Sequence, residues 1–246
     1  MYKIYDLFTE EEVKEITDEL AEYEEEAWED GKQTASGNIA ALKKVDQLTE
    51  DYASTLIPIV LEKMQVNADV QLDNLLMRPV NLMMTRMKEG YSYKWHTDQC
   101  LPAPGSDQST RADLSWTLFL NDPDTYEGGE LVIYGQQSSF LPIKLKAGQV
   151  IFYPASLPHQ VNEVTKGVRF VANGWMQCLV NNLSNRDLCV DSFHAVRRLE
   201  RLSNLVKEQI TNAEEEDQQN INNELCLTTA LVDSIASRVM LMFADR

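Results

Sequence analysis

The stretch Leu114-Ser115-Trp116-Thr117-Leu118-Phe119-Leu120 belongs to a part of the chain in which short apolar and β-branched runs follow one another. The other runs of this kind are Val80 to Met87, Leu131 to Tyr134, Val150 to Tyr153 and Val168 to Trp175. Turn signals that contain glycine separate them, at Glu89-Gly90, Glu127-Gly128-Gly129, Ala147-Gly148-Gln149 and Lys166-Gly167. Regularly spaced short strands of this type predict a β-sandwich or a jelly roll between about residues 78 and 180.

Helical patterns flank this β region. On the N-terminal side, Thr9 and Glu12 form a capping-box sequence, and apolar residues then recur at helical spacing as far as Tyr23. A second helix is expected from about Thr49 to Met64, in which Pro58 is a candidate kink. The polar stretch between them, from residue 30 to 38, predicts a loop.

Helical spacing returns after about residue 182, first at Leu199, Leu202, Val206 and Ile210 and then from Leu225 to Met242. The sequence therefore predicts a mainly β protein with flanking helices. We expect an N-terminal helical region over residues 1–75, a β core over residues 76–180 and a C-terminal helical region over residues 181–246.

A His-x-Asp pair, His96-Thr97-Asp98, and the distant His159 are the residues best suited to chemistry. His96 and Asp98 lie near the end of a strand-like run, where side chains two residues apart point to the same face. Two histidines and one carboxylate are the ligand set of non-haem Fe(II) oxygenases. By itself His-x-Asp is common, and a hydrogen-bonded histidine at a strand edge is the alternative for His159, although two of the three histidines fit one ligand set. The third histidine, His194, has no partner at ligand spacing and is interpreted as structural.

Arg169 follows His159 by ten positions, within an apolar strand. A guanidinium directed inward there would need a carboxylate partner, whereas an outward-facing arginine or an internal salt bridge would need no ligand. Ser115 and Thr117 share one strand face and are candidates to complete a carboxylate site, although threonine is also simply a good strand former. Tyr93 is a candidate hydrogen-bond donor to the same pocket, with core packing as the alternative. Together these residues suggest an iron enzyme that consumes a carboxylate-bearing co-substrate.

Several segments, in order along the chain, resemble the PKHD-type hydroxylases, a bacterial branch of the prolyl 4-hydroxylase-like Fe(II)/2-oxoglutarate dioxygenases. The resemblance covers about residues 75 to 180 and is more specific than the three candidate ligands alone. Its segments are Tyr93 to Asp98, Arg111 to Leu120, Asp122 to Leu131, Tyr153 to His159 and Thr165 to Arg169.

The resemblance implies a double-stranded β-helix (a distorted jelly roll) with flanking helices. It implies that His96, Asp98 and His159 bind Fe(II), that Arg169 binds the C5 carboxylate of 2-oxoglutarate, and that ascorbate serves as reductant. In such enzymes 2-oxoglutarate and dioxygen give succinate and carbon dioxide while an unactivated C–H bond is hydroxylated. A prolyl residue of a polypeptide is the candidate target. Trp95, beside His96, is interpreted as a packing residue, with self-oxidation as the alternative.

The composition restricts the partners. A formal net charge of −17 makes nucleic acid an unexpected partner; solubility explains this charge more simply than attraction to a basic polypeptide. We expect no membrane partner, because no stretch approaches about 18 consecutive apolar residues. The four cysteines include no Cys-x-x-Cys pair, and ferrous iron favours a reducing compartment, so a cytoplasmic location is expected.

Two other functions stay open at this stage. One is a cupin-like module that binds a metal or a metabolite without catalysis, although three ligands are too few for a closed zinc site. The other is an oxygenase of a free small molecule. The loop from Gln99 to Thr110 is equally consistent with a lid over the site and with a plain connection. The C-terminal helices are candidates to cap the β core or to form a homodimer.

Overall fold

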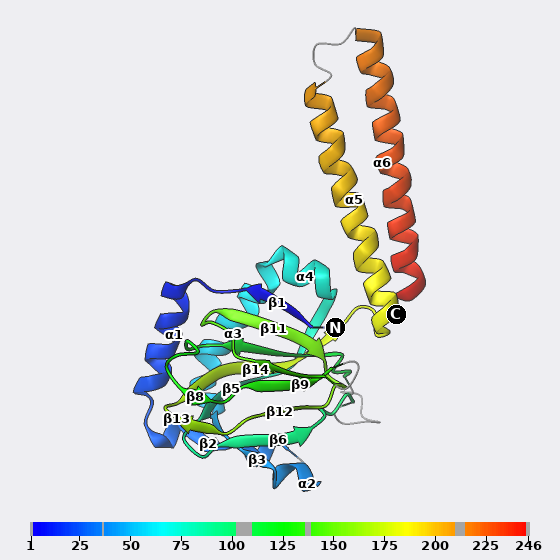
Figure 1. Ribbon diagram of the computed structural model, residues 1–246. Coiled ribbons are helices and arrows are strands. Elements are labelled where there is room, and N and C mark those ends of the chain that lie inside the picture. The colour runs from blue at the N-terminus through cyan, green and yellow to red at the C-terminus, as the bar shows by residue number, and fades with distance from the viewer. Residues whose placement is uncertain (1, 36, 102–109, 136–138, 210–214, 245–246) are drawn as a thin grey trace. The chain divides into compact units, whose positions relative to one another are not determined.

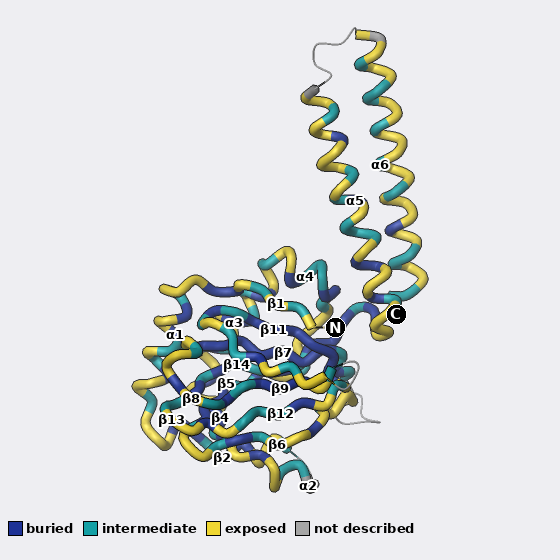
Figure 2. Tube along the Cα trace, viewed as in Figure 1, coloured by how far each residue is buried: buried dark blue, intermediate teal, exposed yellow. Residues whose placement is uncertain are grey.

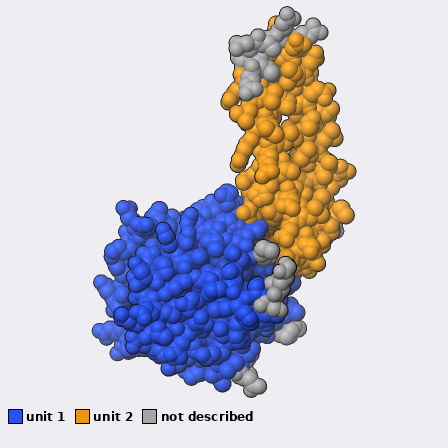
Figure 3. Space-filling view, viewed as in Figure 1, with its two compact units in different colours: residues 1–70, 77–177 blue, residues 71–76, 178–246 orange. Residues whose placement is uncertain are grey.

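The computed structural model describes residues 2–35, 37–101, 110–135, 139–209 and 215–244. The chain divides into two compact units (Figure 3). Unit 1 comprises Met1–Val70 and Met77–Gln177, and unit 2 comprises Gln71–Leu76 and Cys178–Arg246. The candidate ligands all belong to unit 1.

Two antiparallel sheets form the centre of unit 1 (Figure 1). Among the described residues the larger sheet has the strand order β1 (Lys3–Asp6), β11 (Gln149–Pro154), β7 (Leu114–Phe119), β14 (Arg169–Cys178), β5 (Leu76–Met87), β4 (Asp46–Leu48) and β2 (Trp28–Asp30). The smaller sheet has the order β10 (Phe140–Ile143), β9 (Leu131–Tyr134), β12 (His159–Val161), β6 (Ser92–His96) and β3 (Lys43–Lys44). A separate short pair joins β8 (Glu127–Gly128) to β13 (Val164–Lys166).

The hydrophobic core lies between the two sheets. Phe119, Ile151 and Val171 of the larger sheet pack in one buried cluster with Leu131, Ile133 and Ile143 of the smaller sheet. All five predicted strand runs are therefore present, as β5, β7, β9, β11 and β14. The architecture is sheet-rich with helices, as expected.

The N-terminal region contains more strand than predicted. Besides helices it supplies β1, β2, β3 and β4, which occupy edge positions or near-edge positions of both sheets. These strands are two to four residues long and show no extended alternation, so their pairing depends on sheets built elsewhere in the chain. The expected loop from residue 30 to 38 also holds two short helices, η2 (Gly31–Thr34) and α2 (Gly37–Ala40).

Two helices pack along the sheets. α1 (Glu10–Glu22) begins at Thr9 with the predicted capping box, and it buries Val13, Ile16 and Leu20. The Thr17 hydroxyl of α1 also donates a hydrogen bond to the carbonyl of Leu120, next to β7. α3 (Glu50–Val66) continues through Pro58 and buries Ala53, Leu56, Val60 and Met64. The remaining short helices are η1 (Glu25–Ala27) and α4 (Ala68–Asn74).

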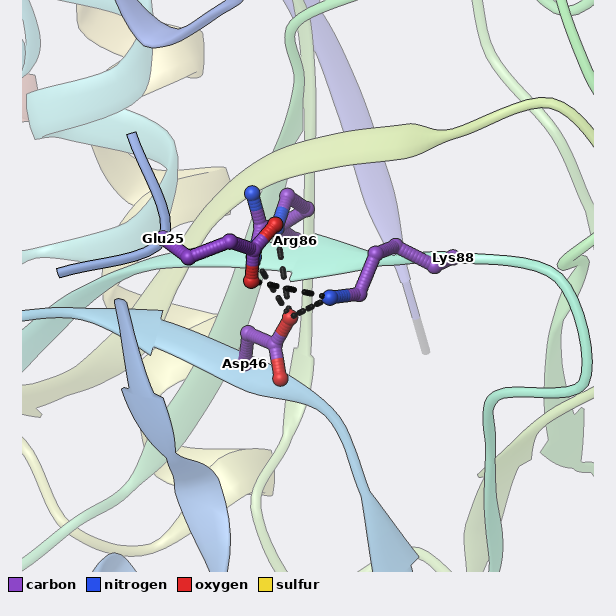
Figure 4. A network of polar contacts seen from close by, with 4 residues as sticks. All are labelled: Glu25, Asp46, Arg86 and Lys88. Atoms are coloured by element: carbon purple, nitrogen blue, oxygen red, sulfur yellow. Dashed lines mark hydrogen bonds and ion pairs between the residues drawn. The ribbon is translucent and has the colours of Figure 1, made fainter. Parts of the chain in front are cut away.

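A four-residue ion network closes one end of the larger sheet (Figure 4). Arg86 of β5 lies 2.8 Å from both Asp46 of β4 and Glu25 of η1. Lys88 Nζ lies 3.1 Å from each of the same two carboxylates. The Arg86 guanidinium is also 4.4 Å from the centre of the Trp28 ring. The network therefore joins β5 to the short N-terminal strands.

Unit 2 consists mainly of a helical hairpin, α5 (Leu183–Gln209) and α6 (Glu215–Phe243), as predicted for this region. Cys189 and Val190 of α5 form a small core with Leu75 and Val180, against which Val239 and Phe243 of α6 pack. Much of the apolar surface stays exposed (Figure 2), including Leu202, Leu227, Leu231, Ile235 and Met242.

By length and composition α6 is able to cross a membrane over Asp217–Phe243, although the sequence holds no uninterrupted apolar run of that length. Helices of soluble proteins reach the same length and hydropathy.

Candidate active site

The smaller sheet places His96 and His159 directly opposite each other. β6 and β12 are antiparallel, and His159 is the register partner of His96. The two imidazole centroids are 4.2 Å apart, and Asp98 follows β6 closely enough to lie beside them. His159 Nε2 is 3.6 Å from Asp98 Oδ2. One ligand atom from each of the three residues lies within 4.8 Å of the other two, which is the spacing of a metal site.

Backbone carbonyls orient both imidazoles. His96 Nδ1 is 2.7 Å from the Lys94 carbonyl, and His159 Nδ1 is 2.9 Å from the Leu157 carbonyl. Because a carbonyl oxygen only accepts, each Nδ1 carries the proton and each neutral ring presents an Nε2 lone pair. Such a hydrogen bond on the other ring nitrogen is the usual support of a metal-bound histidine. The donor set therefore fits a divalent metal.

Ser115 orients the carboxylate of the site. Its hydroxyl donates to Asp98 Oδ2 from β7 of the opposite sheet. Both His96 and His159 are buried, and Asp98 is half-buried. Burial, and then the proximity of His159, lowers the pKa of His96 to about 4. The imidazole therefore remains neutral, as metal binding requires, well below neutral pH.

Arg169 is a buried cation at a different part of the same cavity. Only 2% of the residue is exposed, and its Nε has no hydrogen-bond partner in the part of the chain that the structure describes. Its Nη1 lies 3.7 Å from Met87 Sδ, and the guanidinium is 5.2 Å from the centre of the Phe119 ring. Burial lowers its pKa, and among the described residues no carboxylate lies within ion-pairing distance. An outward-facing arginine and an internal salt bridge are thus both excluded for the described part of the chain.

Gly129 makes room for the Arg169 side chain. A Cβ at position 129 would lie 3.0 Å from Arg169 Cδ and 3.1 Å from Tyr126 Cε2, and the glycine has a φ of +67°. Tyr126 was not predicted as a site residue. Its hydroxyl is buried, and its interaction with Arg169 opposes the effect of burial on the arginine pKa. In the sequence, the only hint of a role for Tyr126 is its position next to the Gly128-Gly129 turn.

The other predicted residues line the cavity in different ways. Ser115 contacts Asp98, so it belongs to the metal end and not to a carboxylate site beside Arg169. Thr117 lies in the cavity wall and interacts with the buried Tyr153 phenol, whose pKa burial raises. The Tyr93 ring stacks on His96 at a centroid distance of 3.6 Å. Its hydroxyl shows no hydrogen bond within the described part of the chain.

The structure also adds a residue that the sequence did not single out. Lys43 of β3 is 6% exposed and lines the cavity that holds the three candidate ligands. Burial lowers its pKa to about 8, against the opposing influence of Asp98 and Asp30. Nothing in the sequence around Lys43-Lys44 predicts burial. Lys43 becomes buried because the two residues pair with β6 as a short strand.

Three further expectations concern residues around the candidate site: the loop from 99 to 110, His194 and Trp95. The proposed lid, residues 99–110, lies largely outside the described residues, which end at 101 and resume at 110. His194 does have an acidic partner, because its Nε2 is 2.8 Å from Asp73 Oδ1 in unit 2. The sequence did not predict this partner. The contact joins α5 to α4 and is consistent with the structural role expected of His194. Trp95 is 39% exposed and contacts Phe140, with ring centroids 5.7 Å apart.

Comparison with known proteins identifies the class of enzyme to which the chain belongs. Residues 82–177, which carry all three candidate ligands and Arg169, match the 2OG-Fe(II) oxygenase superfamily. A PKHD-type hydroxylase of Bordetella pertussis is 36% identical over 205 residues, spanning 81% of this chain and 88% of the relative. One from Pseudoalteromonas atlantica is 38% identical over 200 residues, spanning 80% and 86%. The chain belongs to the PKHD-type hydroxylases and is an Fe(II)/2-oxoglutarate-dependent dioxygenase.

Solved structures agree with the fold. A Pseudomonas putida prolyl-4-hydroxylase superposes with a TM-score of 0.53 at 14% identity, covering 72% of this chain and 92% of that one. A 2OG-Fe(II) oxygenase-family oxidoreductase from Burkholderia pseudomallei gives a TM-score of 0.51 at 14% identity, covering 72% and 85%. At this identity the likeness concerns the fold alone.

Proposed function

We propose that His96, Asp98 and His159 hold the Fe(II) and that Arg169 binds the C5 carboxylate of 2-oxoglutarate. The observation that carries the proposal is the pairing of two complementary features in one cavity. Three oriented ligand atoms lie together at one place, and a buried guanidinium without a carboxylate partner lies at another. A co-substrate that chelates the metal and ends in a carboxylate satisfies both.

Each residue of the site has a defined role in this proposal. The carbonyls of Lys94 and Leu157 fix the imidazole tautomers, and Ser115 fixes the carboxylate. Arg169 orients the co-substrate, and the apolar wall of Leu131, Val161 and Val171 keeps water from it. When bound, iron and 2-oxoglutarate supply the oxidative decarboxylation that is coupled to C–H hydroxylation. We infer that the two sheets form the double-stranded β-helix of such enzymes.

Anaerobic absorbance tests this arrangement. The iron-free protein is titrated with Fe(II) and then with 2-oxoglutarate, and the visible metal-to-ligand charge-transfer band is recorded. We expect the band in the wild type, its loss in His159→Ala and a much higher 2-oxoglutarate requirement in Arg169→Met. Lys44→Met, a charge change at an exposed position, serves as the control. A folded wild type without the band would contradict the site; a band without succinate formation in air would favour the non-catalytic module.

We propose a prolyl residue of a polypeptide as the target. The support is that the relatives are hydroxylases and that the fold is shared with the Pseudomonas putida prolyl-4-hydroxylase. Proline-containing peptides, incubated with the reconstituted enzyme, should yield hydroxyproline on amino-acid analysis. Hydroxylation of a free small molecule, with no peptide modified, would replace this proposal by the alternative.

Three further proposals concern the enzyme's surroundings. Ascorbate as reductant predicts that sustained turnover requires it; equal progress curves without it would remove the role. A cytoplasmic location, supported by four free cysteines among the described residues, is checked by cell fractionation. Homodimer formation through the exposed apolar residues of α5 and α6 predicts a dimer on size exclusion that truncation near residue 180 converts to monomer. The division of the chain at residues 75 and 180 stays a prediction.

A further inference from the structure

Lys43 is the second buried cation of the active-site cavity, and the proposed function leaves it without a task. It contacts Thr34 and Tyr93, whereas Arg169 contacts Met87 and Phe119, so the two cations line different parts of the wall. Lys43 lies on β3 at the edge of the smaller sheet, and its register partner is Tyr93. Tyr93 in turn stacks on the candidate ligand His96.

The hydrogen bonds of Lys43 are incomplete. Its Nζ donates to Thr34 Oγ1 at 2.6 Å, which leaves two of its three donors without an acceptor in the described part of the chain. The nearest ring, Tyr93, has its centre 5.5 Å away, and no carboxylate is within ion-pairing distance among the described residues. A buried ammonium in this condition is costly unless an anion joins it.

The neighbours of Lys43 hold it in place and add hydrogen-bonding groups. Thr34 donates to Gln47 Oε1 at 2.8 Å, and Gln47 Nε2 lies 2.8 Å from Met83 Sδ. On the larger sheet, Thr85 donates to Asn173 Oδ1 at 2.7 Å. All five of these residues line the same cavity as the candidate metal ligands. Thr34 and Gln47 therefore add hydrogen-bonding groups directly beside Lys43.

A surface groove leads to this part of the cavity. It is lined by residues that include Ile39, Thr97 and Gln99, and it shares Thr34, Tyr93, Asp98 and Trp175 with the cavity. A molecule in the groove therefore lies beside Tyr93, Asp98 and Thr34, and Thr34 accepts the hydrogen bond of Lys43 in the adjoining cavity. The position suits recognition of the substrate that is hydroxylated, because the co-substrate is bound through Arg169.

We propose that Lys43 binds a carboxylate of the hydroxylated substrate and thereby positions its C–H bond at the metal. The inference rests on the proposed function, which assigns the metal and Arg169. A carboxylate fits better than a phosphate because one ammonium balances one negative charge. Asp98 and Asp30 both act electrostatically on Lys43, so a doubly charged anion would be repelled. The substrate class is a free acid, or a peptide that carries its carboxylate near the reacting residue.

The test is equilibrium binding to the full chain loaded with Fe(II) and saturating 2-oxoglutarate without oxygen. The probes are the N-acetyl derivatives of the common amino acids, each as the free acid and as the primary amide. We expect at least one acid to bind more tightly than its amide, and Lys43→Met to weaken that acid about 10- to 100-fold while leaving the amide unchanged. Lys43→Arg should retain the preference for the acid. Lys44→Met is the matched control, because Lys44 is the exposed next residue of β3.

Three outcomes would overturn the inference. The first is a panel in which no acid binds more tightly than its amide. The second is an acid preference that survives in Lys43→Met. The third is a loss of 2-oxoglutarate affinity in Lys43→Met as large as the loss of probe affinity, since Lys43 would then serve the co-substrate. The charge-transfer band with Fe(II) and 2-oxoglutarate separates these cases from failure of the proposed function, because it must persist in Lys43→Met. Lys43→Arg keeps the test decisive if Lys43→Met does not fold.

Discussion

Replacing Arg169 by methionine should separate its functional role from a structural one, because the two roles predict opposite changes in stability. The guanidinium is buried and its Nε is unpaired among the described residues, while the Phe119 ring, Met87 Sδ and the Tyr126 phenol interact with it. An unmade buried hydrogen bond costs about 1–3 kcal/mol, and more for a charged group such as this one, while a desolvated cation–π contact returns about 2 kcal/mol. We therefore expect the iron-free Arg169→Met protein to be more stable than the wild type by about 1 kcal/mol.

The same substitution should greatly weaken 2-oxoglutarate binding. Two charge-assisted hydrogen bonds to a carboxylate contribute about 1.5–3 kcal/mol each. Their loss corresponds to an increase in Kd of about 10²- to 10⁴-fold at about 1.4 kcal/mol per tenfold change. Anaerobic titration of the charge-transfer band measures the affinity, and urea denaturation of the iron-free protein measures the free energy of unfolding.

Arg86→Met is the matched control. Arg86 is also buried and lies over an aromatic ring, but it is paired with Asp46 and Glu25 (Figure 4). Its removal leaves Asp46 with Lys88 at 3.1 Å, so we expect a loss of about 2 kcal/mol, below the about 3–5 kcal/mol of fully buried pairs. Its 2-oxoglutarate affinity should not change. The reasoning would be refuted if Arg169→Met lost several kcal/mol of stability while its 2-oxoglutarate affinity stayed normal.

Further predictions concern the metal ligands and the glycine beside Arg169. Ser115→Ala removes the donor to Asp98, so the Fe(II) affinity in the charge-transfer titration should fall about 10-fold; an unchanged affinity would show that this bond does not position the ligand. Gly129→Ala introduces a Cβ 3.0 Å from Arg169 Cδ at a φ of +67°, so KM for 2-oxoglutarate should rise several-fold and stability fall by about 1–2 kcal/mol; a normal KM would contradict the role of the glycine. The iron-free protein should become less stable as the pH falls from 6.5 toward about 4, because the folded-state pKa of His96 lies below its ordinary value and protons therefore favour the unfolded chain. Urea denaturation at about pH 7 and pH 5 should show a contribution of about 2 kcal/mol that is absent in His96→Asn.

The strands and the candidate ligands were predictable because their signals are local. Five apolar runs separated by glycine turns correspond to five strands, and His96 and Asp98 share a face through two-residue spacing alone. The Arg169 prediction used the same kind of argument, since an arginine within an apolar strand needs a partner. Ser115 lines the cavity, but its contact with Asp98 instead of a co-substrate depends on how two strands of different sheets face each other.

The N-terminal strands escaped prediction for the same physical reason. β3 has two residues, and its pairing with β6 supplies backbone hydrogen bonds that no local pattern records. Lys43 acquires its burial only through that pairing. Likewise, Asp73 and His194 are 121 positions apart and meet because both belong to unit 2.

The sequence by itself determined the class of chemistry, because ligand identity and spacing are properties of neighbouring residues and of short motifs. It also determined the sheet-rich architecture, because short hydrophobic runs separated by glycine-containing turns are compatible with few other folds. Only the tertiary structure decided that His159 lies across from His96, that Arg169 has no carboxylate partner in the described chain, and that Lys43 lines the cavity. These facts depend on strand register and on side-chain burial between the sheets, and both arise when segments distant in the sequence pack together.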